Sequence, residues 1–210
     1  MVFYHIDHQC RLKPGLLIVP DAGIVFRERW PDEMCLSVYQ TFPDGLSNFG
    51  VRALLPTSKQ DVASQHTLEF ILEMVRLRSF PEKPSRLSSL FGMRDWRASS
   101  ERWIERLEAD ASTFHVFECE SDSIYTVDAS FLDSPRSAGT ASASASQAEP
   151  LPGIDPSWLS FPAALLHAAR QYWLSCRPLD ELSAEIPEHS ARLEELLVPG
   201  PVRVIRQVLP

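Results

Sequence analysis

The two ends of the chain constrain its fold most strongly, because both are rich in residues that form β-strands. Residues 2–6 (VFYHI) predict an opening strand, and the pair Pro14-Gly15 predicts a turn before a short strand at 16–19. Near the other end, ELLVPGPVRVIRQV predicts two strands around a Pro-Gly-Pro turn. Strands at both ends with helices between them indicate a mixed α+β fold. With 210 residues, the chain is long enough for one domain over 1–210 with a sizeable core.

The middle of the chain contains both helical and extended patterns. Apolar spacing and flanking prolines predict helices over 61–78, 95–108 and 161–176. The segment 80–92 is expected to end the first helix and then to run as a short extended piece. Two strands are predicted at 113–120 and 123–127, paired as a hairpin across Ser121-Asp122. Residues 20–58 are loop-rich and predict no regular element.

The segment 134–157 differs in composition from the rest of the chain. It reads SPRSAGTASASASQAEPLPGIDPS, and such small, polar and proline-rich sequence buries too little apolar surface to fold. We therefore expect a flexible surface insertion within the single domain.

Charge and cysteine usage exclude several classes of function. The net charge is −8, which argues against a general binder of phosphate backbones. The four cysteines lie far apart, so neither a zinc site nor a disulfide framework is expected, and no metal site is predicted. The sequence shows no Sec signal and no span of about 20 apolar residues for a membrane. We expect a cytoplasmic protein, or one delivered into a target cell without a visible signal peptide.

Two groups of polar residues near predicted strands are candidates for a binding site. His5, next to Tyr4, ends the first strand, although for a single residue a histidine on a half-exposed strand face is the simpler explanation. The segment 85–91 places closely spaced hydroxyls around an arginine, which suits phosphates or sugar hydroxyls. The plain alternative is a turn in which the serines bond their own backbone. The candidates in that segment are Ser85, Arg86, Ser88, Ser89 and Phe91.

Acidic residues also lie at the ends of two predicted strands. Glu195 directly precedes the apolar run Leu196-Leu197-Val198, which is typical of an internal strand. Taken alone, Glu194 and Glu195 are explained most simply as caps of the preceding segment that stay in water. A carboxylate at the start of a buried strand otherwise needs a partner or a function, because burying an unpaired charge is costly. Asp128 ends the strand SIYTVD and is expected either to cap the next loop or to shape a site.

Three segments together resemble the ADP-ribosyltransferase superfamily, especially its rifamycin-modifying and DNA-modifying branches. FYHIDHQCRLKPGLLI (3–18) resembles the opening strand and turn of that superfamily. SRLSSLFG (85–92), followed by a tryptophan-containing helix, is similar in position to its middle motif. LEELLVPGPVRVIRQV (193–208) resembles its third motif, a glutamate before a closing pair of strands. The chain also resembles a bacterial family of unknown function with a PSRxxSLF signature.

The resemblance implies an α+β fold with split mixed or antiparallel sheets and flanking helices. It implies a NAD-dependent mono-ADP-ribosyltransferase, a glycosyltransferase that uses NAD as co-substrate, in a bacterial toxin or effector. Glu195 would be the catalytic carboxylate, His5 would bind a ribose of NAD, and Ser88 or Ser89 would support the wall of the pocket. Tyr4, Asp128 and the other candidates of 85–91 are further residues expected to bind NAD. Leu193 stands where arginine-modifying members carry Glu or Gln, so an arginine acceptor is disfavoured. Ser85, Ser88 and Phe91 all remain candidates for the middle position.

Cleavage of the bond between ribose and nicotinamide develops positive charge on the ribose, which a fixed carboxylate stabilises. This hypothesis requires the strands at the two ends of the chain to be neighbours, so that His5 and Glu195 face one ligand. The alternative is a non-catalytic nucleotide- or protein-binding module on the same scaffold, and a third is an unrelated α+β interaction protein. The acceptor is open between protein, nucleic acid and small molecule, and an antitoxin or immunity protein is a further expected partner.

Overall fold

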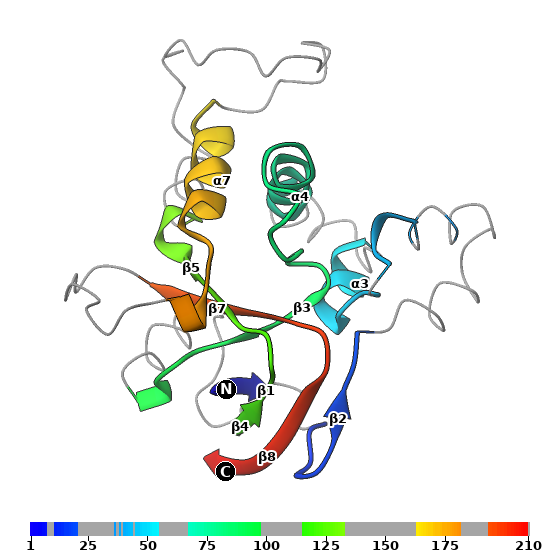
Figure 1. The fold of residues 1–210 in the computed structure, drawn as a ribbon, viewed down its shortest axis with the longest axis vertical. Coiled ribbons are helices and arrows are strands. Elements are labelled where there is room, and N and C mark those ends of the chain that lie inside the picture. The colour runs from blue at the N-terminus through cyan, green and yellow to red at the C-terminus, as the bar shows by residue number, and fades with distance from the viewer. Residues whose placement is uncertain are drawn as a thin grey trace.

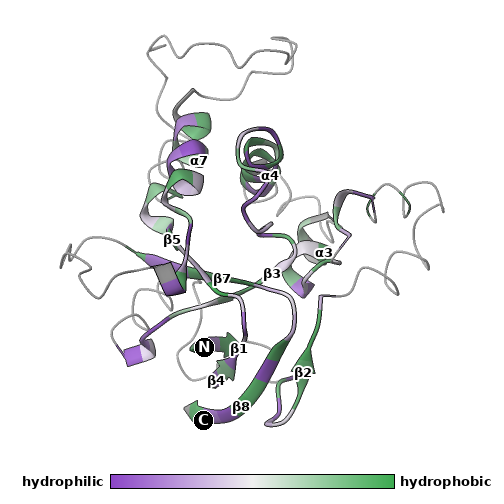
Figure 2. Cartoon of the chain, in the orientation of Figure 1, coloured by the Kyte–Doolittle hydropathy of each residue, from purple (hydrophilic) through white to green (hydrophobic). Residues whose placement is uncertain are grey.

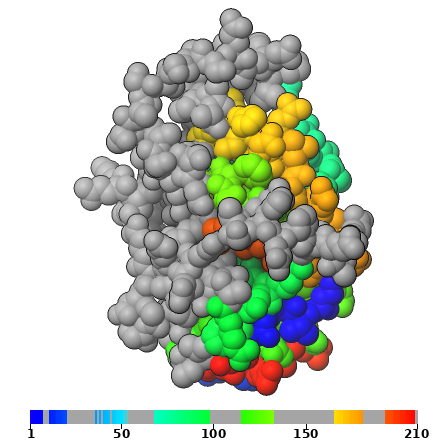
Figure 3. Space-filling model, turned by 90° about the vertical axis from the view of Figure 1, so that its left-hand side faces the viewer, coloured from blue at the N-terminus to red at the C-terminus, as the bar shows by residue number. Residues whose placement is uncertain are grey.

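The computed structural model shows an α+β fold in which two antiparallel sheets lie beside a layer of helices (Figure 1). It describes residues 1–7, 11–20, 36, 38, 40–43, 45–54, 67–97, 115–132, 163–181 and 193–209. In Figure 1 the helices α4 and α7 lie on one side of the second sheet, and the first sheet lies on the other. On the face shown in Figure 3, the first residues (blue) and the last strand (red) lie at the same end of the molecule. No helix within the described residues is long and apolar enough to cross a membrane.

The first sheet contains both terminal strands. Its order is β1-β4-β8-β2, with every neighbouring pair antiparallel. The bounds are Val2–Asp7 for β1, His115–Glu120 for β4, Val202–Leu209 for β8 and Leu17–Ile18 for β2. The strand β8 curves strongly along its length (Figure 1), and its register with β4 shifts twice. The predicted opening strand, the turn at Gly15 and the closing strand are therefore confirmed.

The second sheet has the order β3-β7-β5-β6 and is also antiparallel. Its strands are β3 (Ser89–Gly92), β7 (Glu194–Pro199), β5 (Tyr125–Asp128) and β6 (Arg177–Pro178). A single bridge between Tyr4 and Met93 links β1 of the first sheet to the end of β3. The two sheets are thus split, and within the described residues this bridge joins their facing edges.

Two connections carry the chain from one sheet to the other. Between β7 and β8, the turn passes through Gly200 at φ +83°, a backbone conformation that favours glycine. Between β4 and β5, the chain crosses at 121–124, where the Ser121 hydroxyl donates to the Pro201 carbonyl at 3.1 Å. The predicted hairpin between these strands is wrong, because β4 pairs with β1 and β8 whereas β5 pairs with β6 and β7.

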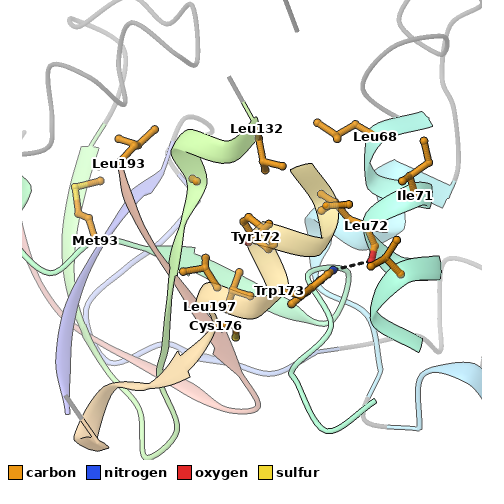
Figure 4. Packing of buried hydrophobic residues seen from close by; sticks show 14 of the residues in the cluster. Leu68, Ile71, Leu72, Met93, Leu132, Tyr172, Trp173, Cys176, Leu193 and Leu197 are labelled. Atoms are coloured by element: carbon orange, nitrogen blue, oxygen red, sulfur yellow. Dashed lines mark hydrogen bonds between the residues drawn. The ribbon is translucent and has the colours of Figure 1, made fainter. Parts of the chain in front are cut away.

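Helices α4 (Thr67–Ser79) and α7 (Ala163–Ser175) pack together beside the second sheet. The indole Nε1 of Trp173 donates to the Leu72 carbonyl at 2.7 Å, which joins the two helices inside the core (Figure 4). Both helices carry apolar and polar residues (Figure 2), and the apolar side chains of one face enter the core. Two short 3₁₀ helices, Ala129–Leu132 and Leu179–Glu181, follow β5 and β6.

A second core fills the space on the other side of the second sheet. It is built from Phe3, Phe117, Leu196, Val198 and other residues of both sheets. Gly92 of β3 makes room for Phe3, since a Cβ atom at Gly92 would lie 2.5 Å from the Phe3 ring. The strand β7 therefore contributes to two cores, with alternate side chains pointing to opposite faces.

Most of the elements predicted from the sequence are present where the structure describes the chain. The predicted helices of 61–78 and 161–176 are confirmed over the described residues by α4 and α7, and the extended piece of 80–92 is confirmed by β3. The first residues of both predicted helices, 61–66 and 161–162, lie outside the described residues. The structure adds the helix α3 (Asn48–Leu54) in a region where no element was predicted. The predicted helix over 95–108 lies almost entirely outside the described residues, as does the insertion over 134–157.

Candidate functional site

Glu195 is the second residue of β7 and points toward the helices. It is 3% exposed, and its neighbour across the sheet is Val127 of β5. Its Oε2 atom accepts a hydrogen bond from the Tyr172 hydroxyl at 2.6 Å and another from Nη1 of Arg86. The carboxylate predicted at the mouth of a strand is therefore a buried and paired group.

Arg86 is the centre of this cluster. Its Nε and Nη2 atoms donate to the two carboxylate oxygens of Glu69 at 2.8 and 3.1 Å. Its guanidinium carbon lies 4.7 Å from the centre of the Phe91 ring and 5.0 Å from that of Tyr172, distances at which cation–π attraction operates. We call Glu69, Arg86, Phe91, Tyr172 and Glu195 the Arg86 cluster. Its members come from α4, α7, β3, β7 and the segment before β3, so it ties the helices to the second sheet.

The electrostatics of the cluster keep Arg86 charged. Burial acts to lower the pKa of the guanidinium, but the charges of Glu195 and Glu69 outweigh burial and raise that pKa well above its ordinary value. Burying an ion pair costs desolvation energy, which good geometry and further hydrogen bonds must offset. With two carboxylates for one guanidinium, the cluster carries one negative charge in formal excess.

The two oxygens of Glu195 differ in their surroundings. Both of its hydrogen bonds go to Oε2, and Oε1 accepts none from the residues that the structure describes. Arg86 would keep its two bonds to Glu69 if Glu195 changed partner. The cluster therefore holds one carboxylate oxygen of Glu195 in place and leaves the other without a donor from the described residues.

Tyr172 makes the cluster sensitive to alkaline pH. Burial raises the pKa of its phenol well above the ordinary value; Arg86 opposes the rise and Glu195 adds to it. Because the folded state favours the protonated phenol, its contribution to stability is complete below the unfolded pKa of about 10. We expect that contribution to fall as the pH rises above about 10, at up to about 1.4 kcal/mol per pH unit. Urea unfolding of wild type and Tyr172→Phe between pH 8 and 11 measures it, and equal slopes for the two proteins would contradict the prediction.

The serines of the middle segment have their hydroxyls committed to the protein. Ser85 donates to Glu73 at 2.9 Å, and Ser88 donates to the Gly45 carbonyl at 2.6 Å. Ser89 is fully buried and donates to the Ser85 carbonyl at 2.7 Å. The turn interpretation fits Ser89 and the Leu87 N–H that donates to the Ser85 hydroxyl, whereas the hydroxyls of Ser85 and Ser88 donate to residues of other segments. Arg86 and Phe91 are the members of the segment that reach Glu195 or its partners.

His5 and Glu195 lie in different sheets, so the expectation that their strands are neighbours is wrong. The strand β1 pairs with β4 and bridges to the end of β3, and β3 in turn pairs with β7. His5 still approaches the cluster, because its Nδ1 lies 2.7 Å from the Phe91 carbonyl oxygen. This contact fixes Nδ1 as the protonated nitrogen, since a carbonyl only accepts hydrogen bonds. Tyr4 exchanges backbone hydrogen bonds with Met93 and packs against the core between sheet and helices.

Asp128 caps the short 3₁₀ helix that follows β5. Its Oδ1 accepts hydrogen bonds from the backbone N–H and the hydroxyl of Ser130 at 3.1 and 2.5 Å. Of the two roles expected for this residue, the structure thus shows the cap. Asp128 also lies opposite Glu194 in the register of β5 and β7.

Two members of the cluster, Glu69 and Tyr172, were not predicted as site residues. A signal for Glu69 exists in the spacing of α4, where Glu69, Glu73 and Arg76 recur at helical intervals and all three are buried. Tyr172 lies in the predicted helix over 161–176 and is fully buried, and both its hydroxyl and its ring contact Arg86. Within the described part of the chain, no group of three or more acidic, histidine or cysteine side chains could hold a metal ion.

Comparison with known proteins places the chain in a family. Residues 52–209 match the model of a family described as "Protein of unknown function (DUF2441)". This match covers well over half of the chain, which therefore belongs to the DUF2441 family. No curated protein matches the sequence.

Proposed function

We propose that the protein is a NAD-dependent mono-ADP-ribosyltransferase in which Glu195 is the catalytic carboxylate. The observation that carries the proposal is the state of Glu195 within the Arg86 cluster. Its Oε2 is held by Arg86 and Tyr172, and its Oε1 receives no hydrogen bond from the described residues. The resemblance of three segments to the superfamily, and a fold with split antiparallel sheets and flanking helices, support it further.

The chemistry follows from the charge of the cluster. When the bond between the nicotinamide nitrogen and the ribose carbon breaks, its electron pair leaves with nicotinamide and positive charge develops on the ribose. A carboxylate that accepts a hydrogen bond from the ribose 2′-hydroxyl stabilises this charge, and more so away from water. The formal excess of one negative charge has the sign required. The acceptor nucleophile then forms the new bond to the ribose carbon.

The other residues have supporting roles in this proposal. Tyr172 and Arg86 hold Oε2, so Glu195 presents Oε1 in a fixed direction, which lowers the cost of ordering the site. Arg86 remains paired with Glu69 throughout. His5 and Tyr4 on β1 would contact the sugar or nicotinamide of NAD from the neighbouring sheet. As a bacterial toxin or effector, the protein would transfer ADP-ribose to a separate acceptor molecule. An antitoxin or immunity protein would restrain this activity.

Incubation of the purified protein with NAD tests the proposal. We expect release of nicotinamide, measured by chromatography. We also expect covalent transfer of ADP-ribose to a component of a cell lysate, measured with labelled NAD. Folded protein that neither releases nicotinamide nor labels any component would contradict the proposal.

A non-catalytic binding module is the second candidate. It is favoured by the burial of Glu195 and by the serine hydroxyls that are already bonded within the protein. Calorimetry with NAD separates the two candidates. Saturable binding of NAD that leaves it intact over hours supports the module, and binding with turnover supports the transferase.

A further inference from the structure

A second polar contact lies at the start of β7, on the face opposite Glu195. Nη2 of Arg94 donates to Oε1 of Glu194 at 2.5 Å, and the Thr126 hydroxyl donates to the same oxygen at 3.0 Å. Consecutive side chains of a strand point to opposite faces, so Glu194 and Glu195 serve different sites. The side chains of Arg94 and Glu194 are 37% and 33% exposed, so a ligand can reach part of the pair from solvent, and a turn of the Arg94 side chain would open its buried Nε atom to that ligand.

The pairing of Arg94 is incomplete in a way that the pairing of Arg86 is not. Glu69 takes both Nε and Nη2 of Arg86, whereas Glu194 takes only Nη2 of Arg94. The Nε atom of Arg94 is buried and has no acceptor among the described residues. A buried donor without a partner is costly and needs an explanation, such as a ligand that supplies the acceptor.

Glu194 shows the matching feature. Both hydrogen bonds to its carboxylate go to Oε1, and Oε2 accepts none from the residues that the structure describes. The pair thus presents a buried N–H donor, Nε of Arg94, and a carboxylate acceptor, Oε2 of Glu194, on either side of an existing ion pair. Arg94 and Glu194 neutralise each other, so the site does not attract an anion, and a ligand carboxylate or phosphate would face the charge of Glu194.

We propose that Arg94 and Glu194 bind a neutral group that carries a hydrogen-bond acceptor beside an N–H donor. The acceptor bonds Nε of Arg94, and the N–H bonds Oε2 of Glu194. A primary carboxamide has this pattern in its oxygen and its amino group, and adenine has it in N7 and its 6-amino group. The inference does not depend on the transferase activity, because it concerns binding at a separate face of β7.

NMR titration of the full chain with small fragments measures their binding and tests the inference. Nicotinamide represents the carboxamide and adenosine the base, and nicotinate is the matched ligand with two acceptors and a negative charge. We expect wild type to bind nicotinamide or adenosine at least tenfold more tightly than nicotinate. The fragment that binds more tightly shows whether the bound group is a carboxamide or an adenine base. Absence of binding by both, or tighter binding of nicotinate, would overturn the inference.

Two conservative variants isolate the two atoms. Arg94→Lys keeps the charge but removes Nε, and should weaken binding of the preferred fragment at least tenfold, whereas the exposed control Arg97→Lys should not change it. Glu194→Gln replaces one oxygen by an N–H donor, so it should shift the preference toward nicotinate, which offers a second acceptor. Thermal unfolding verifies that each variant is folded. Unchanged binding in Arg94→Lys, or an unchanged preference in Glu194→Gln, would remove these atoms from the site.

Discussion

Replacement of Arg86 by methionine is expected to lower the free energy of unfolding by about 3–5 kcal/mol, because it leaves two buried carboxylates without their partner. Glu69 and Glu195 are 4% and 3% exposed, so water cannot readily solvate their charges in the folded protein. Methionine fills most of the space of the arginine, which confines the effect to the loss of charge and hydrogen bonds. Urea unfolding at neutral pH measures the change.

Two controls define this result. Arg206 pairs with Glu118 at 2.8 Å on the surface, and Arg206→Met should leave the unfolding curve almost unchanged. Adding Glu69→Gln and Glu195→Gln to Arg86→Met removes the unpaired charges, so the triple variant should recover much of the loss. A stability loss below about 1 kcal/mol for Arg86→Met would show that the buried pairing is not formed in solution.

Replacement of Glu195 by glutamine is expected to reduce the release of nicotinamide from NAD by about a hundredfold or more. The amide oxygen of glutamine can still accept from Tyr172 and Arg86, so the fold should be retained. The negative charge that stabilises the ribose in the transition state is lost. Single-turnover release of nicotinamide at saturating NAD, with circular dichroism as the test of folding, measures the effect on the chemical step.

The matched control for Glu195 is Glu120, an acidic residue that pairs with Arg203 on the exposed surface of the first sheet. Glu120→Gln should turn over NAD at the wild-type rate. If Glu195→Gln also retains full activity, Glu195 has no part in the mechanism and its role is the neutralisation of Arg86.

The strands and helices could be predicted where local sequence determines them. The opening strand, the Pro-Gly-Pro turn and the helices α4 and α7 all follow from apolar spacing and turn residues. The helix α3 could not be predicted, because distant residues support it: a Cβ atom at Gly50 would lie 2.0 Å from the Leu87 carbonyl oxygen. The hairpin prediction failed for a similar reason, since strands adjacent in sequence belong to different sheets.

The candidate site was predictable only in part. Glu195 and Arg86 could be singled out as polar residues beside buried strands, but their direct contact joins positions 109 residues apart in the sequence. Glu69 and Tyr172 lie on helices, and only tertiary packing brings them to Arg86. Local patterns therefore identify which residues need partners, whereas the topology decides who the partners are.

A structure of the protein with NAD bound is the measurement that tests the role of Glu195 most directly. We predict that Oε1 of Glu195 lies within hydrogen-bond distance of the 2′-hydroxyl of the nicotinamide ribose, while Arg86 keeps both bonds to Glu69. NAD bound elsewhere, with both oxygens of Glu195 still enclosed by protein, would contradict the account.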